Sequence, residues 1–463
     1  MAGTLDATTA RVMGKRAIGA RRWGVYKTVH RDAPIGLDSS RMSVFRFVHA
    51  ADLHLDTPFD GLARLGGEVP ELLRDASLQA FENLVAETLR VRAHALVLAG
   101  DIYDGPERGL RAQLRFHAGL KRLSDAGVAV VMVHGNHDPL ADGWSAIRAW
   151  PEGVTVLPSD RVASVPVHAD GREVARVYGI SYARRDTTAN LAKCFPARTD
   201  APFAIGVLHA NVGANGEHAA YSPCELADLA AADIDYWALG HIHRYQHLSE
   251  GAPWAVYAGV LQGRSPKPSE QGAKGAAVVE VADNAVRGVT FTPLDVVRFA
   301  ELEVDVAGLS DIAELQGRLQ AEADSALEEA GERQLILRAR LIGRGPVHAM
   351  LAAGGDTVEE LRGALQASAR RVWWDRIVDA TAPPIDPDAI RRRGDFAAEL
   401  LHRYDALAAD PEARAAFLAR HCRPGDRNLR ELRDDAGESG GEAAILDAAV
   451  MAALDRLEPG DES

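Results

Sequence analysis

The sequence predicts an α/β protein whose first large domain is built on parallel strands. Over residues 45–137, apolar segments of strand length alternate with longer segments of helical periodicity. Each apolar segment stops abruptly at polar residues, as parallel strands that are buried on both faces do. Beyond residue 151 the apolar segments become short, which is typical of mostly β structure.

Three strands and two helices are expected in the first layer. The helices are predicted over residues 71–92, where leucine and alanine recur largely on one face, and over 110–124. The strands and the polar residues that follow them are 45–51 before Asp52, 95–99 before Asp101, and 128–133 before Asn136. Ligands of open α/β sheets gather beyond the carboxyl ends of the strands, so these polar groups should meet at one edge.

A second layer, mostly β, should close this domain, which we place at residues 43–297. Its expected strands are 161–167, 174–180, 203–208, 236–239, 254–257 and 276–281. A small α+β domain is predicted over residues 298–382, with strands at 301–306, 335–341 and 372–378 and a helix at 311–330. Pro383, Pro384 and Pro387 indicate a linker. The remainder, residues 383–463, should be helical, either as a docking region for a partner or as a plain helical hairpin.

Composition and charge narrow the class of protein. The net charge of −14 argues against a generally basic protein that coats nucleic acid. It does not argue against a nuclease, because local basic patches and bound cations can hold phosphate. The three cysteines form no CxxC pair, which fits a reducing compartment and excludes a thiolate zinc site. Because no apolar run is long enough to span a bilayer, we expect a cytoplasmic protein without a membrane partner.

The first residues differ from the rest in charge. Lysine and arginine outnumber acidic residues there, and Met42 stands directly before the first predicted strand. We expect residues 1–42 to be a disordered basic extension, with Met42 as a candidate translation start. A basic arm that binds nucleic acid is the alternative.

Five polar clusters carry the chemistry. They stand in the order Asp52-Leu53-His54, Gly100-Asp101-Ile102-Tyr103-Asp104, Gly135-Asn136-His137-Asp138, Leu208-His209-Ala210-Asn211 and Gly240-His241-Ile242-His243. Singly each is weak, because a histidine at a strand end is usually a hydrogen-bonded surface group. Together, each at the end of an apolar strand, they predict a metal site.

The ligand types indicate which metals would bind. Carboxylate, imidazole and amide oxygen without thiolate suit Mn²⁺ best, with Fe or Zn²⁺ as alternatives. Two divalent cations need a bridging carboxylate. Asp101 is the candidate bridge, because it follows the middle strand of the three.

These clusters resemble those of the calcineurin-like metallophosphoesterases, and within them the SbcD-type DNA repair nucleases. The runs closest to the bacterial YhaO-type branch are Ala51-Asp52-Leu53-His54-Leu55-Asp56-Thr57-Pro58-Phe59, Leu208-His209-Ala210-Asn211-Val212-Gly213 and Tyr257-Ala258-Gly259-Val260-Leu261-Gln262-Gly263-Arg264. The resemblance implies a four-layer sandwich of two mixed β-sheets flanked by helices, with the α+β domain as a cap. It also implies DNA as substrate, an SMC-like ATPase subunit as partner and a homodimer.

The resemblance further implies a role for each site residue. The first metal would be held by Asp52, His54, Asp101 and His243, and the second by Asp101, Asn136, His209 and His241. His137 would be the catalytic histidine, oriented by Asp138, acting on the leaving oxygen. A water that bridges the metals would be ionised near neutral pH and attack phosphorus in line.

Residues around the site are open to two interpretations. Asp104 would support the ligands or cap a turn. Arg264 and Arg184 could bind substrate phosphates, although solvated surface charge is the ordinary role of an arginine such as Arg184. Trp373-Trp374 is more typical of packing than of base stacking.

The residues together with the family resemblance leave three functions open. The leading one is a Mn²⁺-dependent DNA exonuclease in repair, with endonuclease capacity left open as a second activity. The others are a hydrolase of small phosphodiesters, nucleotides or phosphoproteins, and a non-catalytic scaffold for an SMC-like ATPase.

Overall fold

The computed structural model describes residues 44–57, 69–105, 109–141, 145–213, 221–421 and 442–457. The extension expected over residues 1–42 lies outside them. Contacts along the chain define two compact units. The first takes in the described residues up to 302 with 323–338 and 369–375; the second takes in 303–322, 339–368 and those from 376 onward. The domain boundaries expected near 297 and 382 stay a prediction.

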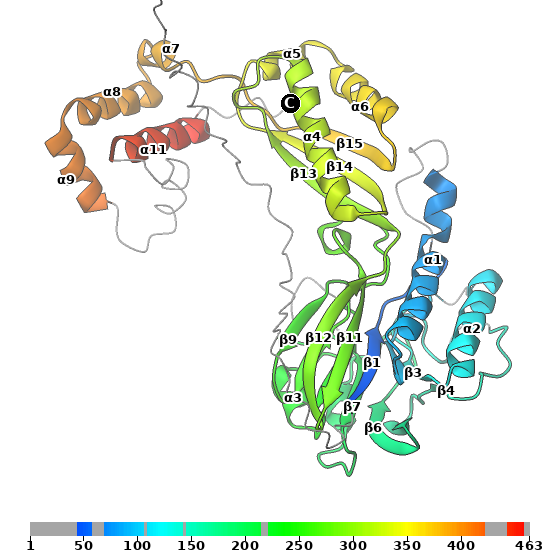
Figure 1. Cartoon of the computed structure of the whole chain (residues 1–463). Helices are drawn as coiled ribbons and strands as arrows, with labels where there is room; N and C mark the ends of the chain where they lie inside the picture. Colours follow the sequence, from blue (N-terminus) through cyan, green and yellow to red (C-terminus); the bar gives the residue numbers. More distant parts are fainter. Residues whose placement is uncertain are drawn as a thin grey trace, which may run out of the picture. The chain divides into compact units, whose positions relative to one another are not determined.

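The first sheet contains the three strands that precede the polar clusters. Its order is β12-β11-β1-β2-β3-β4. Figure 1 labels β12, β11, β1, β3 and β4 of this sheet. The parallel strands are β1 (Val44–Ala50), β2 (Ala95–Ala99), β3 (Ala129–Val133) and β4 (Val154–Val156). β2 is therefore the middle strand of the three, as the sequence predicted.

The other edge of this sheet corrects one expectation. β11 (Gly275–Ala282) pairs antiparallel with β1, and β12 (Ala285–Pro293) pairs antiparallel with β11. The strand expected at residues 276–281 is thus present, but it lies in the first sheet and not in the second. Its apolar residues predict a strand, but the choice of a pairing partner more than 200 residues away is not a local property.

The second sheet carries the last two polar clusters. Its order is β5-β6-β7-β8-β10-β9, with β6, β7, β8 and β10 parallel. The strands are β5 (Ala163–Ala169), β6 (Arg172–Gly179), β7 (Ala204–His209), β8 (Tyr236–Gly240), β9 (Gln246–Ser249) and β10 (Trp254–Tyr257). His209 ends β7, and Gly240 at the end of β8 leads directly to His241.

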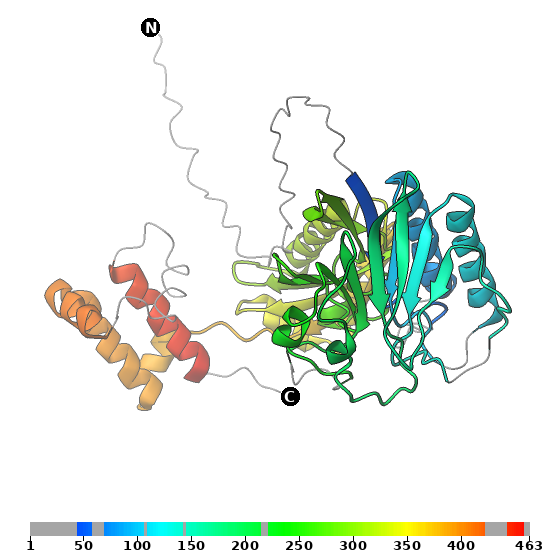
Figure 2. The same ribbon diagram turned by 90° about the horizontal axis from the view of Figure 1, so that it is seen from below.

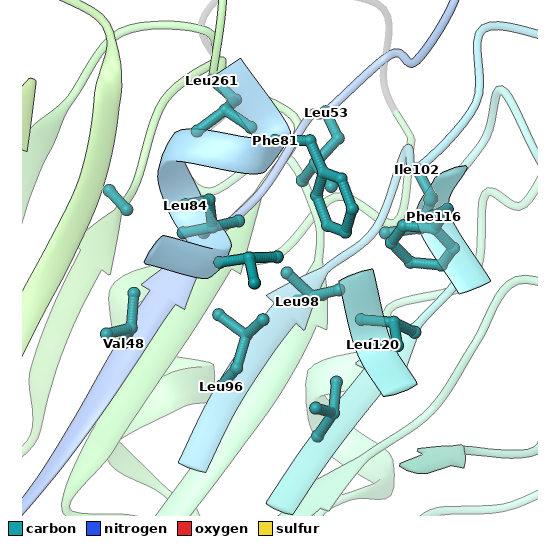
Figure 3. Close-up of a cluster of buried hydrophobic side chains, with 14 of the residues drawn as sticks. Val48, Leu53, Phe81, Leu84, Leu96, Leu98, Ile102, Phe116, Leu120 and Leu261 are labelled. Atoms are coloured by element: carbon teal, nitrogen blue, oxygen red, sulfur yellow. The ribbon is translucent and has the colours of Figure 1, made fainter. Parts of the chain in front are cut away.

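Helices cover the outer face of each sheet. α1 (Val69–Arg90) and α2 (Leu110–Asp125) pack on the first sheet, and Figure 2 shows both on the same side of its strands. In Figure 3, Phe81 and Leu84 of α1 and Phe116 of α2 lie over Leu96 and Leu98. The Phe81 and Phe116 ring centroids are 5.1 Å apart.

The outer face of the second sheet is covered by α3 (Leu226–Ala230) and the short 3₁₀ helix η1 (Leu191–Cys194). Phe195, just after η1, packs on Trp237 with ring centroids 4.6 Å apart. Between the sheets, Phe47 and Val97 of the first meet Ile205 and Val207 of the second in one buried cluster. The predicted four-layer sandwich is confirmed.

A third sheet has the order β13-β14-β15. Its strands are β13 (Val297–Asp305), β14 (Gln334–Ile342) and β15 (Val372–Asp379), and the predicted helix is α4 (Ile312–Ala330). Two further helices, α5 (Val347–Ala353) and α6 (Thr357–Ser368), were not expected. Trp374 is buried and Trp373 packs on a hydrophobic cluster, which supports packing over base stacking.

The last described segment is helical, as predicted. It contains α7 (Pro387–Arg391), α8 (Phe396–Ala409), α9 (Pro411–His421) and α11 (Glu442–Leu457). Leu401 of α8 packs with Val450 and Leu454 of α11 in a small core of its own. None of the helices in the described part of the chain is long and apolar enough to cross a membrane.

Candidate metal centre

The polar clusters converge where the strands of both sheets end. Asp52, Asp101 and Asn136 follow the parallel strands β1, β2 and β3, so they share one edge. His209 and His241 come from the ends of β7 and β8, which are also parallel neighbours. The predicted site is therefore assembled from both sheets.

Ligand atoms lie close together throughout this cluster. Nε2 of His209 is 3.4 Å from Oδ2 of Asp101 and 2.9 Å from Oδ1 of Asn136. Nε2 of His54 is 3.9 Å from the same Asp101 oxygen and 3.3 Å from Nε2 of His243. These nitrogen and oxygen atoms converge on one region, as the ligands of a cation do.

Three groups of ligand atoms could hold a metal ion. One contains Asp52, His54 and His243, and another Asp52, Asp101 and His209, with the atoms of each group within 4.8 Å of one another. The third contains His54, Asp104 and His137, and only one of its members is shared with the other two groups. The ring of His241 lies beside that of His209, with centroids 5.3 Å apart. The structure thus brings all seven predicted ligands into one cluster, with carboxylates in the middle.

Four of the seven hold an uncommon backbone conformation. The φ angle is 51° at Asp52, 42° at His54, 51° at Asp101 and 100° at His241. Positive φ is uncommon in residues other than glycine, and such strain concentrates at functional sites. Backbone hydrogen bonds fix the strained turns: the N–H of His54 donates to the carbonyl of Asp101 at 3.0 Å.

Two glycines let the strand ends approach this closely. A Cβ at Gly135 would collide with the Asp101 carboxylate and the His209 ring. A Cβ at Gly240 would collide with the carbonyl of Ala99, the same carbonyl that lies 2.9 Å from Nδ1 of His209. Glycine at both positions is therefore a requirement of the site's packing.

The electrostatics fit divalent cations. Burial raises the pKa of Asp52 to about 6, although His209 and His243 oppose the rise. Burial would also raise the pKa of Asp101, but His209 and His54 hold it below its ordinary value. Burial lowers the pKa of His54 to about 4, which keeps its imidazole neutral as a metal ligand must be. Two buried neighbouring carboxylates are costly unless positive charge compensates them, and the donor set suits a metal.

The partner of His137 differs from the one predicted. Its Nδ1 lies 3.1 Å from Oδ1 of Asp104, and its side chain is 31% exposed. Asp138 was expected to orient it, and that expectation is wrong. Adjacency in sequence favoured Asp138, but the turn directs its carboxylate into the core.

Asp138 instead holds the turn that presents Asn136. Its carboxylate accepts hydrogen bonds from the N–H of Gly135 at 2.9 Å and of Ile102 at 3.0 Å, and lies 2.9 Å from Nδ1 of His134. The side chain is fully buried. Asp138 therefore stabilises the turn, and its buried carboxylate cannot reach a substrate.

Asp104 connects three groups of the site. Besides His137, its Oδ1 lies 2.9 Å from Nδ1 of His54 and 2.9 Å from Nη1 of Arg264. The first of the two interpretations of Asp104, support of the ligands, is the one that the contacts favour. Arg264 is thereby drawn to the cluster with a side chain that is only 16% exposed. Arg184 lies on an exposed turn, where its carbonyl accepts from the Thr187 hydroxyl.

One functional residue was missed from the sequence. Glu270, in the 3₁₀ helix η2 (Pro268–Glu270), places Oε1 2.7 Å from Nδ1 of His243. Burial would raise its pKa, but His243 and Arg264 lower it to about 2. No apolar strand precedes Glu270, so the pattern that revealed the ligands does not apply to it.

The sequence is similar to known protein families and proteins. Residues 45–245 match the calcineurin-like phosphoesterase family, and residues 299–382 match the middle domain of metallophosphoesterase YhaO. The chain is 34% identical over 339 residues to the uncharacterized metallophosphoesterase YhaO of Bacillus subtilis, an alignment that covers 72% of this chain and 81% of that protein.

Two further relatives are named for work on nucleic acid. The chain is 29% identical over 399 residues to the DNA double-strand break repair protein Mre11 of Haloferax volcanii, covering 83% of this chain and 80% of that protein. It is 26% identical over 249 residues to one of the subunits of the nuclease SbcCD of Bacillus subtilis, covering 46% of this chain and 61% of that protein.

Proposed function

The chain belongs to the YhaO family of calcineurin-like metallophosphoesterases, and from this premise we propose that it is a two-metal-dependent DNA phosphodiesterase, an exonuclease of DNA repair. The family is one of phosphoester hydrolases, and the chain has candidate metal ligands in the place that the fold provides. The single observation that carries the proposal is the convergence of Asp52, Asp101 and His209 with the neighbouring imidazoles. DNA as the substrate rests on the similarity to Mre11 and to the SbcCD nuclease.

The proposed ligands divide between two cations. Asp52, His54, Asp101 and His243 would hold one, and Asp101, Asn136, His209 and His241 the other. Mn²⁺ fits this mixture of oxygen and imidazole donors best, with Fe or Zn²⁺ as alternatives. When bound, two such cations supply Lewis-acid activation of the phosphodiester and of the attacking water.

The residues that are not ligands act on the substrate. His137 is half-buried beside the cluster, and its Nδ1 is held by Asp104. Burial opposes protonation of His137, but the charges of Asp104 and Asp101 raise its pKa above the ordinary value. We propose that His137 donates a proton to the leaving oxygen.

Arginine side chains would hold the phosphates that flank the scissile bond. Arg264 faces the cluster through its contact with Asp104, so a phosphate bound there meets a guanidinium already fixed in place. Arg184, on its exposed turn, would contact a phosphate farther along the strand. Cleavage of a polymer uses both arginines, whereas a small diester can reach only the inner one.

The substrate is tested by parallel turnover assays with Mn²⁺. We expect the chain to degrade linear duplex DNA, with Asp101→Ala as the inactive control. Degradation of a small chromogenic phosphodiester alone, with DNA left intact, would favour the alternative hydrolase of small phosphodiesters. Absence of turnover on both substrates would favour a scaffold.

Assembly and location are part of the same proposal. We propose that the helices from α7 to α11 dock an SMC-like ATPase subunit, that the chain forms a homodimer, and that it works in the cytoplasm. The name of the SbcCD relative describes that protein as part of a larger nuclease, which supports the first of these. Co-purification of the full chain with an SMC-like ATPase, lost on truncation after residue 382, is the expected result; binding that survives the truncation would contradict docking through these helices.

A further inference from the structure

We infer that Glu270 is a positioning residue for the metal centre, which aims the imidazole of His243 at its cation and thereby sets the affinity of one metal position and not the other. The inference rests on the proposed metal site. It concerns a residue that lies 27 positions beyond His243, in the short 3₁₀ helix η2.

The contact has the geometry of a carboxylate behind a metal-binding histidine. Oε1 of Glu270 lies 2.7 Å from Nδ1 of His243, while Nε2 of the same ring faces the cluster, 3.3 Å from Nε2 of His54. Metal-binding histidines usually donate their second ring N–H to a carboxylate or carbonyl, which fixes the tautomer and the ring orientation. Glu270 therefore directs Nε2, and not Nδ1, toward the cation.

His243 needs this support more than His54 and His209 do. The side chains of His54 and His209 are fully buried, so packing alone restricts their rings. The side chain of His243 is 20% exposed and belongs to the turn after β8. A ring at the rim of a site can rotate out of line, and the hydrogen bond to Glu270 is what holds it.

Glu270 is itself held rigidly. Its second carboxylate oxygen accepts from the backbone N–H of Arg264 at 3.0 Å. Its own carbonyl approaches Gly263 so closely that a Cβ there would lie 2.5 Å away. Nζ of Lys274 donates to the carbonyl of Ser269 at 2.6 Å and to that of His243 at 3.3 Å, which ties the two loops together.

The two proposed metal positions are supported differently. Both imidazoles of the first position are backed by carboxylates, His54 by Asp104 and His243 by Glu270. His209 of the second position is backed by the carbonyl of Ala99. A carboxylate raises the basicity of the imidazole more than a neutral carbonyl does, so Glu270 should strengthen the first position alone.

The test is a calorimetric titration of metal-free protein with Mn²⁺, together with metal analysis at defined free Mn²⁺. We expect Glu270→Ala to weaken one of two dissociation constants by about 10–100-fold, the usual effect of losing such a partner, and to leave the other unchanged. Glu270→Gln should lose less, because an amide oxygen still accepts from Nδ1–H. The positions are told apart by His54→Ala and His209→Ala, each of which removes a ligand of one position.

The chain offers a matched control in His247 and Glu250. Their Nδ1 to Oε1 distance is 2.9 Å, a contact of the same kind, but Glu250 is 69% exposed and belongs to the loop after β9. Glu250→Ala should leave both constants unchanged. Urea unfolding of the metal-free variants separates a loss of fold from a loss of positioning.

Three results would overturn the inference. In the first, both Glu270→Ala and Glu270→Gln bind Mn²⁺ with the dissociation constants of the wild type. In the second, Glu270→Ala weakens both Mn²⁺ dissociation constants equally. In the third, Glu270→Gln loses as much Mn²⁺ affinity as Glu270→Ala does. In each of these cases a wild type with two bound ions leaves the proposed function standing. A wild type without bound metal would instead overturn the metal site and the inference together.

Discussion

Oδ1 of Asp104 lies 3.1 Å from Nδ1 of His137, so the contact engages one ring nitrogen and leaves Nε2 as the one that can reach a substrate oxygen. His137 is thus held in place by a residue that is not one of the seven proposed ligands. His137→Ala should lower kcat by about 10²–10⁴-fold, the usual contribution of a general acid, and should keep both metals. The measurements are single-turnover hydrolysis and metal analysis of the same preparation.

The matched variant is Asp101→Ala. Oδ2 of Asp101 lies near both His54 and His209, so its removal should abolish metal binding together with activity. A His137→Ala protein that is emptied of metal like Asp101→Ala would show that His137 is itself a ligand.

Asp138 should matter for folding and not for the chemical step. Its carboxylate accepts from two buried backbone N–H groups, and removing a buried acceptor leaves those donors unpaired. Hydrogen bonds to a charged group contribute about 1.5–3 kcal/mol each, so Asp138→Ala should cost roughly 3 kcal/mol of unfolding free energy. Urea unfolding of the metal-free protein measures this. An Asp138→Ala protein with unchanged stability and a reduced kcat would contradict this account and support a catalytic role for Asp138.

Because His49 is buried, we expect the stability of the protein to depend on pH. It is fully buried between the sheets, with Nδ1 3.1 Å from the Tyr236 hydroxyl, and burial lowers its pKa from 6.5 to about 3. Between those two values the unfolded chain binds a proton that the folded chain does not, so this contribution to stability is lost as the pH falls below about 6.5.

The sign of this pH dependence is tested with the variant His49→Gln, because glutamine does not titrate. The slope is at most about 1.4 kcal/mol per pH unit, so the stability advantage of the wild type over the variant should shrink by about 2 kcal/mol between pH 7.5 and pH 5. Urea unfolding at several pH values gives the difference. If the difference in unfolding free energy between the wild type and His49→Gln stays constant, or grows toward pH 5, His49 is charged in the folded protein.

The two arginines should affect DNA cleavage unequally. Arg264 is fixed by Asp104 beside the metal ligands, whereas Arg184 is exposed on a turn. Loss of a charge-assisted phosphate contact of about 1.5 kcal/mol raises KM about tenfold, which we expect for Arg264→Ala, with a smaller change for Arg184→Ala. Both variants should show a weaker dependence of KM on salt, since each removes a counterion-releasing contact. An Arg264→Ala enzyme with an unchanged KM for DNA would place the phosphate elsewhere.

Sequence reasoning reached the proposed metal ligands because each one lies at or just beyond the end of a recognisable strand. Asp52, Asp101 and Asn136 end apolar parallel strands, and a parallel arrangement is enough to bring them to one edge. β11 shows where that reasoning stops. Its residues predict a strand, but its pairing with β1 depends on which edge of a distant sheet is open, and the sequence pattern does not contain that information.

The support of the ligands was harder to predict than the ligands. Asp138 follows His137 in the chain, yet its carboxylate points into the core, while Asp104 reaches His137 from another loop. Glu270 reaches His243 from a 3₁₀ helix of three residues, a segment without period or strand signal. Side-chain direction at turns is decided by tertiary packing, so sequence adjacency was a poor guide there.

The account depends most directly on the number of divalent ions that the wild-type chain binds. Metal analysis by mass spectrometry, after equilibration with defined free Mn²⁺ and compared with Asp101→Ala, measures that number. The convergence of carboxylates and imidazoles predicts two ions per wild-type chain and almost none in the variant. A wild-type content below one ion per chain would contradict the two-metal site and favour a scaffold that has kept the fold.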